Sequence, residues 1–182
     1  ASATVNGKEI TIALAGSVEV GKDYAVSIAA GAIGYNAENS NAAINLSVKT
    51  PYVLDGVYYL YDAANELFLG RGAAYGTEAV ADKYGVAFNL KTNAQGVSSI
   101  EFVDWTGVYL FANKNGQASG VYTDNVSTGW VLTKTDGGFY LKDARGDFYA
   151  KHSNGDYGVY VHTVADIASA TIWTLKSVAE RD

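Results

Sequence analysis

The sequence predicts an all-β protein in which a unit of about 40 residues occurs three times. Each unit ends on an aromatic-x-Leu motif, and the aromatic residues of successive motifs are separated by 42 and 43 residues. Each unit begins on an apolar strand that ends in Asp, with spacings of 42 and 39 residues. The closing motifs are Phe88-Asn89-Leu90, Trp130-Val131-Leu132 and Trp173-Thr174-Leu175, and the opening motifs are Leu60-Tyr61-Asp62, Phe102-Val103-Asp104 and Leu141-Lys142-Asp143.

The composition favours the same fold class. The 182 residues include 14 tyrosines, 20 glycines and a single proline, a mixture typical of short strands joined by glycine turns. We expect four strands in each unit, with the repeated Leu, Val and aromatic residues in the core. One such unit cannot bury its apolar face alone, so the three units are expected to close on one another.

Three closing units over residues 52–178 resemble the β-trefoil, a barrel capped by hairpins around a pseudo-threefold axis. A β-propeller has a similar repeat length but needs about four blades or more to close. The sequence therefore predicts a β-trefoil preceded by a short Ig-like or β-sandwich segment.

The only proline, Pro51, marks the predicted domain boundary between residues 1–51 and 52–182. Period-2 alternation before it predicts about four strands, most clearly over residues 10–14, 24–28 and 43–48. Residues 24–51 resemble the C-terminal half of bacterial Ig-like modules of surface proteins. A half-module leaves an apolar face uncovered. We expect either the β-trefoil or, preferably, a separate N-terminal fragment of the same precursor, cleaved ahead of Ala1, to cover that face.

The charge of the chain excludes some partners. Its formal net charge is −6 with a pI near 4.8, whereas nucleic-acid binding requires a basic surface. No apolar run approaches the roughly 20 residues that span a bilayer, so no membrane insertion is expected. The chain has no cysteine, which excludes disulfides and thiol chemistry.

Residues 58–90 resemble β-trefoil modules attached to secreted proteins of gut Bacteroidetes, which implies a secreted or cell-surface bacterial location. Ricin-type lectins, the best-known β-trefoils, bind sugar with an Asp near the second strand and a Gln-x-Trp element. Here Gly70 and Arg71 stand where that Asp is expected, and the closing motifs lack the Gln. The ricin-type galactose site is therefore not expected.

The best candidates for ligand binding are the aromatic residues that the repeat does not explain: Trp105, Tyr75, Tyr84 and Tyr157. Exposed rings of this kind stack on sugars or anchor protein partners, although each could instead cover an end of the barrel. The repeated Asp62, Asp104 and Asp143 could accept hydrogen bonds from sugar hydroxyls. We prefer to interpret them as turn residues that bond their own backbone.

Motifs for catalysis are missing from the sequence. His152 and His162 are the only histidines and are interpreted as ordinary loop or strand residues, with no Gly-x-Ser-x-Gly or His-Glu-x-x-His motif beside them. We expect no enzyme activity, metal or cofactor. The predicted function is a non-catalytic module that binds a glycan or glycoprotein. The alternative is a structural or interaction module docking another domain or fragment of a larger parent protein, and protease inhibition ranks third.

Overall fold

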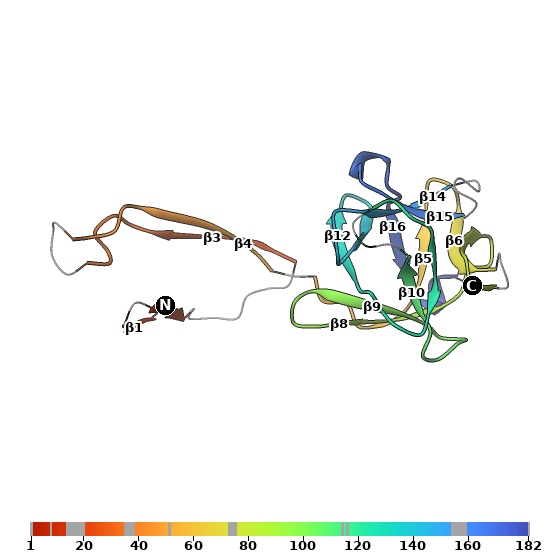
Figure 1. The fold of residues 1–182 in the computed structure, drawn as a ribbon, viewed down its shortest axis with the longest axis horizontal. Coiled ribbons are helices and arrows are strands. Elements are labelled where there is room, and N and C mark those ends of the chain that lie inside the picture. The colour runs from red at the N-terminus through yellow and green to blue at the C-terminus, as the bar shows by residue number, and fades with distance from the viewer. Residues whose placement is uncertain are drawn as a thin grey trace. The chain divides into compact units, whose positions relative to one another are not determined.

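A computed structural model describes residues 2–7, 9–13, 21–34, 39–50, 52–72, 76–113, 115, 117–153 and 160–181. The chain divides into two compact units, Ala1–Pro51 and Tyr52–Asp182 (Figure 1). Apart from short helical turns, the described elements are strands, so the prediction of an all-β protein is confirmed.

The first unit contains two hairpins in its described part. β1 (Ser2–Asn6) pairs with β2 (Glu9–Ala13), and β3 (Asp23–Ile28) pairs with β4 (Ile44–Lys49) in a separate two-stranded sheet. The register of β3 and β4 places apolar residues opposite one another on one face, in the pairs Tyr24–Val48, Val26–Leu46 and Ile28–Ile44. Leu46 and Val48 remain 53% and 45% exposed.

The second unit contains the remaining strands: β5 (Gly56–Asp62), β6 (Leu67–Arg71), β7 (Ala79–Asp82), β8 (Phe88–Thr92), β9 (Val97–Phe102), β10 (Tyr109–Ala112), β11 (Val121–Asp124), β12 (Trp130–Thr135), β13 (Gly138–Asp143), β14 (Tyr149–His152), β15 (Val161–Val164) and β16 (Trp173–Lys176). A 3₁₀ helix, η2 (Ile167–Ser169), precedes β16, and a short helix, α2 (Val178–Arg181), follows it.

Pairing closes six of these strands into a ring. The order is β5, β8, β9, β12, β13 and β16, and β16 pairs back with β5 (Figure 1). The strands β6–β7, β10–β11 and β14–β15 form three hairpins, and the bridges Glu78–Tyr122 and Gly120–His162 link these hairpins to one another.

The core of the second unit contains the residues of the closing motifs. Phe88, Trp130 and Trp173 have no exposed surface, which confirms the prediction that these aromatics are core residues. The leucines of the three motifs lie opposite apolar residues of the neighbouring strand, in the pairs Leu90–Ile100, Leu132–Leu141 and Leu175–Leu60.

The register corrects the predicted opening motif of the middle unit. Trp130 lies opposite Asp143 and Trp173 opposite Asp62, whereas Phe88 lies opposite Phe102. Phe102, and not Asp104, therefore occupies the position of the other two aspartates. The physical reason is packing: Phe102 is fully buried against Phe88, with ring centroids 4.9 Å apart.

Two glycines with similar backbone geometry test how tightly Val97 packs against the residue before β12. Gly129 has φ +80°, and a Cβ there would overlap the Val97 side chain, whereas Gly137 has φ +83° and open space around it. We expect Gly137→Ala to cost about 1 kcal/mol from the left-handed backbone alone. Gly129→Ala should cost about 2 kcal/mol or more, because Val97 must also move. Urea unfolding measures both, and equal costs would contradict the described packing at Val97.

Candidate functional site

The structure describes two of the four predicted ligand-binding aromatics, because Tyr75 and Tyr157 lie outside the described residues. Tyr84 is 75% exposed in the loop between β7 and β8, where Arg181 Nη2 donates a 3.0 Å hydrogen bond to its carbonyl oxygen. Trp105 is 40% exposed in the turn between β9 and β10. Both rings therefore lie at the surface.

Trp105 belongs to a small cluster with Arg71 and Asp104. The Arg71 guanidinium carbon lies 4.8 Å from the centroid of the Trp105 ring. Arg71 Nη2 also donates to Asp104 Oδ2 at 2.9 Å. Arg71 and Asp104, which are 33 positions apart in sequence, thus hold one exposed indole in place. We call Trp105, Arg71 and Asp104 the Trp105 platform.

A concave site lies elsewhere on the second unit, between the β5–β6 turn, the β12–β13 turn, β14 and the segment before β16. It is a pocket of about 490 Å³, which we call the His152 pocket. Its polar lining residues supply both hydrogen-bond donors and acceptors. The lining consists of Asp62, Ala63, Ala64, Asn65, Asp136, Gly137, Lys151, His152, Ser169, Ala170, Thr171 and Ile172.

Asp62 anchors one wall of the His152 pocket and is only 1% exposed. Its Oδ1 accepts the backbone N–H groups of Ala64 and Asn65 at 3.1 and 3.3 Å. Its Oδ2 accepts Asn65 Nδ2 at 2.8 Å and faces His152 Nδ1 at 3.2 Å. The backbone bonds confirm the turn interpretation of Asp62, and the other contacts add a positioning role.

The other two opening aspartates differ from each other. Asp143 Oδ1 accepts the backbone N–H of Arg145 at 3.0 Å, so the turn interpretation is confirmed there as well. Asp104 is instead paired with Arg71. Phe102 has no carboxylate to accept a backbone N–H in this turn. Glu101 supplies one instead, because its Oε1 accepts the N–H of Gly107 at 2.8 Å.

His152 is held from two sides. Its backbone N–H donates to Thr171 Oγ1 at 2.8 Å, and its side chain, 7% exposed, faces Asp62. Because an ionised carboxylate only accepts hydrogen bonds, the pair with Asp62 favours a proton on His152 Nδ1. The interpretation of His152 as an ordinary strand residue missed this pair. Its partner is 90 residues away, so no local sequence pattern signals it.

The strand registers relate His152 to Arg71. The second strand of each unit ends at an equivalent residue, which is Arg71, Ala112 or His152. The residues opposite these three on the neighbouring strand are Ala79, Val121 and Val161, respectively. Arg71 and His152 each reach an aspartate in or beside the first hairpin turn of the next unit around the ring. At the third junction, Arg145 donates to the Ala112 carbonyl while pairing with Asp143.

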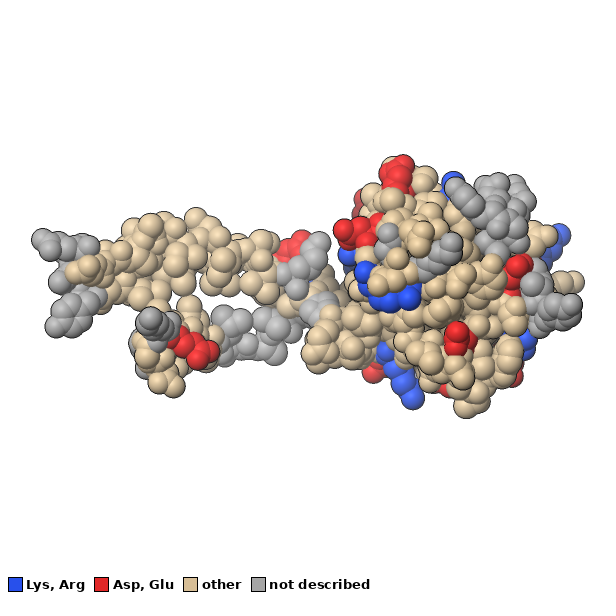
Figure 2. Space-filling view, in the orientation of Figure 1, with Lys and Arg blue, Asp and Glu red and all other residues tan. Residues whose placement is uncertain are grey.

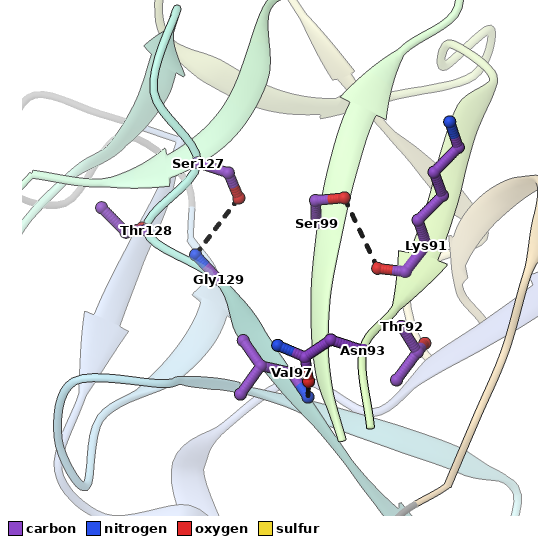
Figure 3. Close-up of a pocket in the computed structure, with 8 residues that line it drawn as sticks. All are labelled: Lys91, Thr92, Asn93, Val97, Ser99, Ser127, Thr128 and Gly129. Atoms are coloured by element: carbon purple, nitrogen blue, oxygen red, sulfur yellow. Dashed lines mark hydrogen bonds between the residues drawn. The ribbon is translucent and has the colours of Figure 1, made fainter. Parts of the chain in front are cut away.

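A second pocket, of about 430 Å³, lies between the β8–β9 turn and the loop before β12 (Figure 3). Several of its polar groups already serve the local turns: Asn93 Oδ1 accepts the Val97 N–H and Ser127 Oγ accepts the Gly129 N–H. Among the described residues that line it, Lys91 alone is charged. The His152 pocket, which combines a carboxylate-oriented imidazole with a lysine and an amide, is the stronger candidate site.

Charge is distributed evenly over the face of the second unit shown in Figure 2, where acidic and basic side chains lie among each other. In the described part of the chain, no three histidine or carboxylate side chains gather closely enough to hold a metal ion. No described helix is long and apolar enough to cross a bilayer.

No model of a known protein family matches the sequence, and no curated protein matches it. Among solved structures, the chain resembles one described as "Structure and mode of action of a mosquitocidal holotoxin", with a TM-score of 0.54 and 15% sequence identity. The match covers 76% of this chain and 19% of the toxin chain. The chain thus spans about a fifth of that protein, and the likeness concerns the fold alone.

Proposed function

We propose that residues 52–182 form a β-trefoil module of the ricin-lectin-like kind that binds a glycan or glycoprotein without catalysis. The ring of six strands, the three hairpins and the likeness to a mosquitocidal holotoxin support the fold. In this proposal the module belongs to a secreted or cell-surface bacterial protein. The His152 pocket is the observation that carries the functional part.

The volume and the chemistry of the His152 pocket suit a sugar. Ligand pockets typically measure about 300–1,000 Å³, so about 490 Å³ has room for one or two sugar residues. Sugar hydroxyls both donate and accept hydrogen bonds. The pocket offers the imidazole of His152, the amide of Asn65, the ammonium of Lys151 and the carboxylate of Asp136. Positive and negative groups are mixed, which favours a polyhydroxyl ligand over a strongly anionic one.

Preorganisation adds to this argument. Asp62 is buried and fixes both Asn65 and His152 before any ligand arrives. A binding group that is already oriented loses less conformational entropy on binding. Tyr84, Tyr75 and Tyr157 stay predicted contacts for the same glycan, and Tyr84 is not among the described residues that line the pocket.

A glycan array tests the proposal with a pair of matched lysine variants. We expect Lys151→Ala to weaken array binding about tenfold, because one charged donor is lost from the His152 pocket. Lys91→Ala, in the other pocket, should bind like the parent protein. Absence of binding to every glycan of a broad array would overturn the function, and equal loss in both variants would overturn the assignment of the pocket.

A second candidate function, a structural or interaction module, is favoured by the first unit. The apolar face of β3 and β4 has Leu46 and Val48 about half exposed, and isolated two-stranded sheets are marginally stable in water. We propose that residues 1–51 belong to an Ig-like sandwich completed by a further fragment or domain of the parent protein. Purification of the chain from its natural source with a second fragment of the same precursor would support this.

A further inference from the structure

We propose that the Trp105 platform is a second saccharide-contact site, on which a pyranose ring stacks against the indole face that Arg71 leaves free. This inference rests on the proposed glycan-binding function. It adds a second site with its own chemistry, at a different junction of the ring from the His152 pocket.

Trp105 is displayed by a well-fixed turn. Its backbone N–H donates to the Phe102 carbonyl at 3.3 Å, and its own carbonyl accepts the Val108 N–H at 3.1 Å. The ring nevertheless stays 40% exposed, whereas Trp130 and Trp173 are fully buried. The backbone is thus ordered while the side chain projects from the core.

The core does not require an aromatic residue at this place. Phe102 fills the core position of this turn, and Asp104 and Trp105 follow it toward solvent. In the corresponding turns of the other units, Asn65 and Gly146 stand three residues after Asp62 and Asp143, as Trp105 stands three after Phe102. Because a small residue suffices there for folding, packing does not account for the tryptophan.

The neighbours of Trp105 supply what a stacked sugar needs. The electron-rich face of an indole attracts the C–H groups on the apolar face of a pyranose. Arg71 covers one face at 4.8 Å and holds the ring in place, while its own position is fixed by Asp104. The Asp104 side chain is 51% exposed, so its carboxylate can accept hydroxyl groups at the ring edge. Arg71 Nε is buried without a hydrogen-bond partner in the described structure.

The two sites are too far apart to share one sugar residue. The β5–β6 turn that lines the His152 pocket precedes Leu67, and Arg71 ends the same strand, β6. The strand is about 13 Å long at about 3.3 Å per residue. The sites therefore contact different sugars, and a surface that displays many copies would be bound by both together.

Acrylamide quenching of tryptophan fluorescence reports on the Trp105 platform selectively, because the other two tryptophans are buried. The probes are methyl β-galactoside, methyl α-mannoside and methyl β-N-acetylglucosaminide, added to Lys151→Ala protein to weaken the His152 pocket. We expect at least one probe to reduce the quenching constant. The Arg71→Met variant should lose about tenfold in affinity for that probe. Unchanged quenching with all three probes would overturn the inference.

The glycan array separates this inference from the function on which it rests. Trp105→Ala should weaken array binding by the parent protein about tenfold, and Tyr160→Ala, which removes another ring that is 44% exposed, should not. If the array is negative for the parent protein, the glycan-binding function fails. If the array is positive but Trp105→Ala binds fully, only the second site fails. Binding of Trp105 to a peptide and to no saccharide would likewise overturn it.

Discussion

Replacing Asp62 by alanine is expected to destabilise the protein by about 3 kcal/mol, because it removes a buried carboxylate that accepts several hydrogen bonds. The carboxylate is 1% exposed and accepts the backbone N–H groups of Ala64 and Asn65 together with Asn65 Nδ2. It also faces the buried imidazole of His152. The substitution would leave the imidazole of His152 without its acceptor, at a cost of about 1–3 kcal/mol, whereas the amides of the exposed residues Ala64 and Asn65 could turn to water. Urea unfolding should show a lower midpoint at an unchanged slope.

Asp104→Ala is the matched control, because the sequence repeat suggests that Asp62 and Asp104 are equivalent. In the structure Asp104 is 51% exposed and makes a surface ion pair with Arg71. Such pairs contribute about 1 kcal/mol or less. Similar losses of unfolding free energy in the two variants would show that the strand register in which Phe88 pairs with Phe102 is wrong.

Trp130→Phe is expected to cost about 3 kcal/mol, and Trp173→Phe only about 1 kcal/mol. Both indoles are fully buried and both substitutions remove the same volume. Trp130 Nε1 donates to the Leu110 carbonyl at 2.9 Å, so its loss leaves that carbonyl without its donor. Trp173 Nε1 is buried without a partner in the described part of the chain. Removing an unsatisfied donor relieves a cost and offsets part of the cavity penalty.

Thermal or urea unfolding of the two variants gives the comparison directly. The far-ultraviolet spectra should stay like that of the parent protein, because phenylalanine already fills the corresponding position at Phe88. An equal or larger loss for Trp173→Phe would mean that its indole N–H has an acceptor, and would contradict the described environment.

Patterns that reflect the core were predictable from sequence. The closing motif identifies Phe88, Trp130 and Trp173 because a buried aromatic recurs wherever one strand of the ring closes a unit. The opening motif misled at the middle unit, where an aspartate two residues after Phe102 imitates the pattern. Only the pairing of β8 with β9 reveals that Phe102 holds the core position.

Another repeated feature was present in the sequence and missed. Asp82, Asp124 and Asp166 are spaced by 42 residues, and each accepts the backbone N–H two residues later. Asp82 and Asp124 end β7 and β11, whereas Asp166 lies two residues after β15 and caps η2. Their period alone could have identified them as turn residues. The Asp62–His152 pair had no such signal, since it joins residues that only the closure of the ring brings together.

The pairing of β16 with β5 has a consequence for how the second unit sits within a longer chain. Lys176 lies opposite Tyr59, so the first and last strands of the ring run side by side. A polypeptide that enters this unit therefore leaves it beside the point of entry.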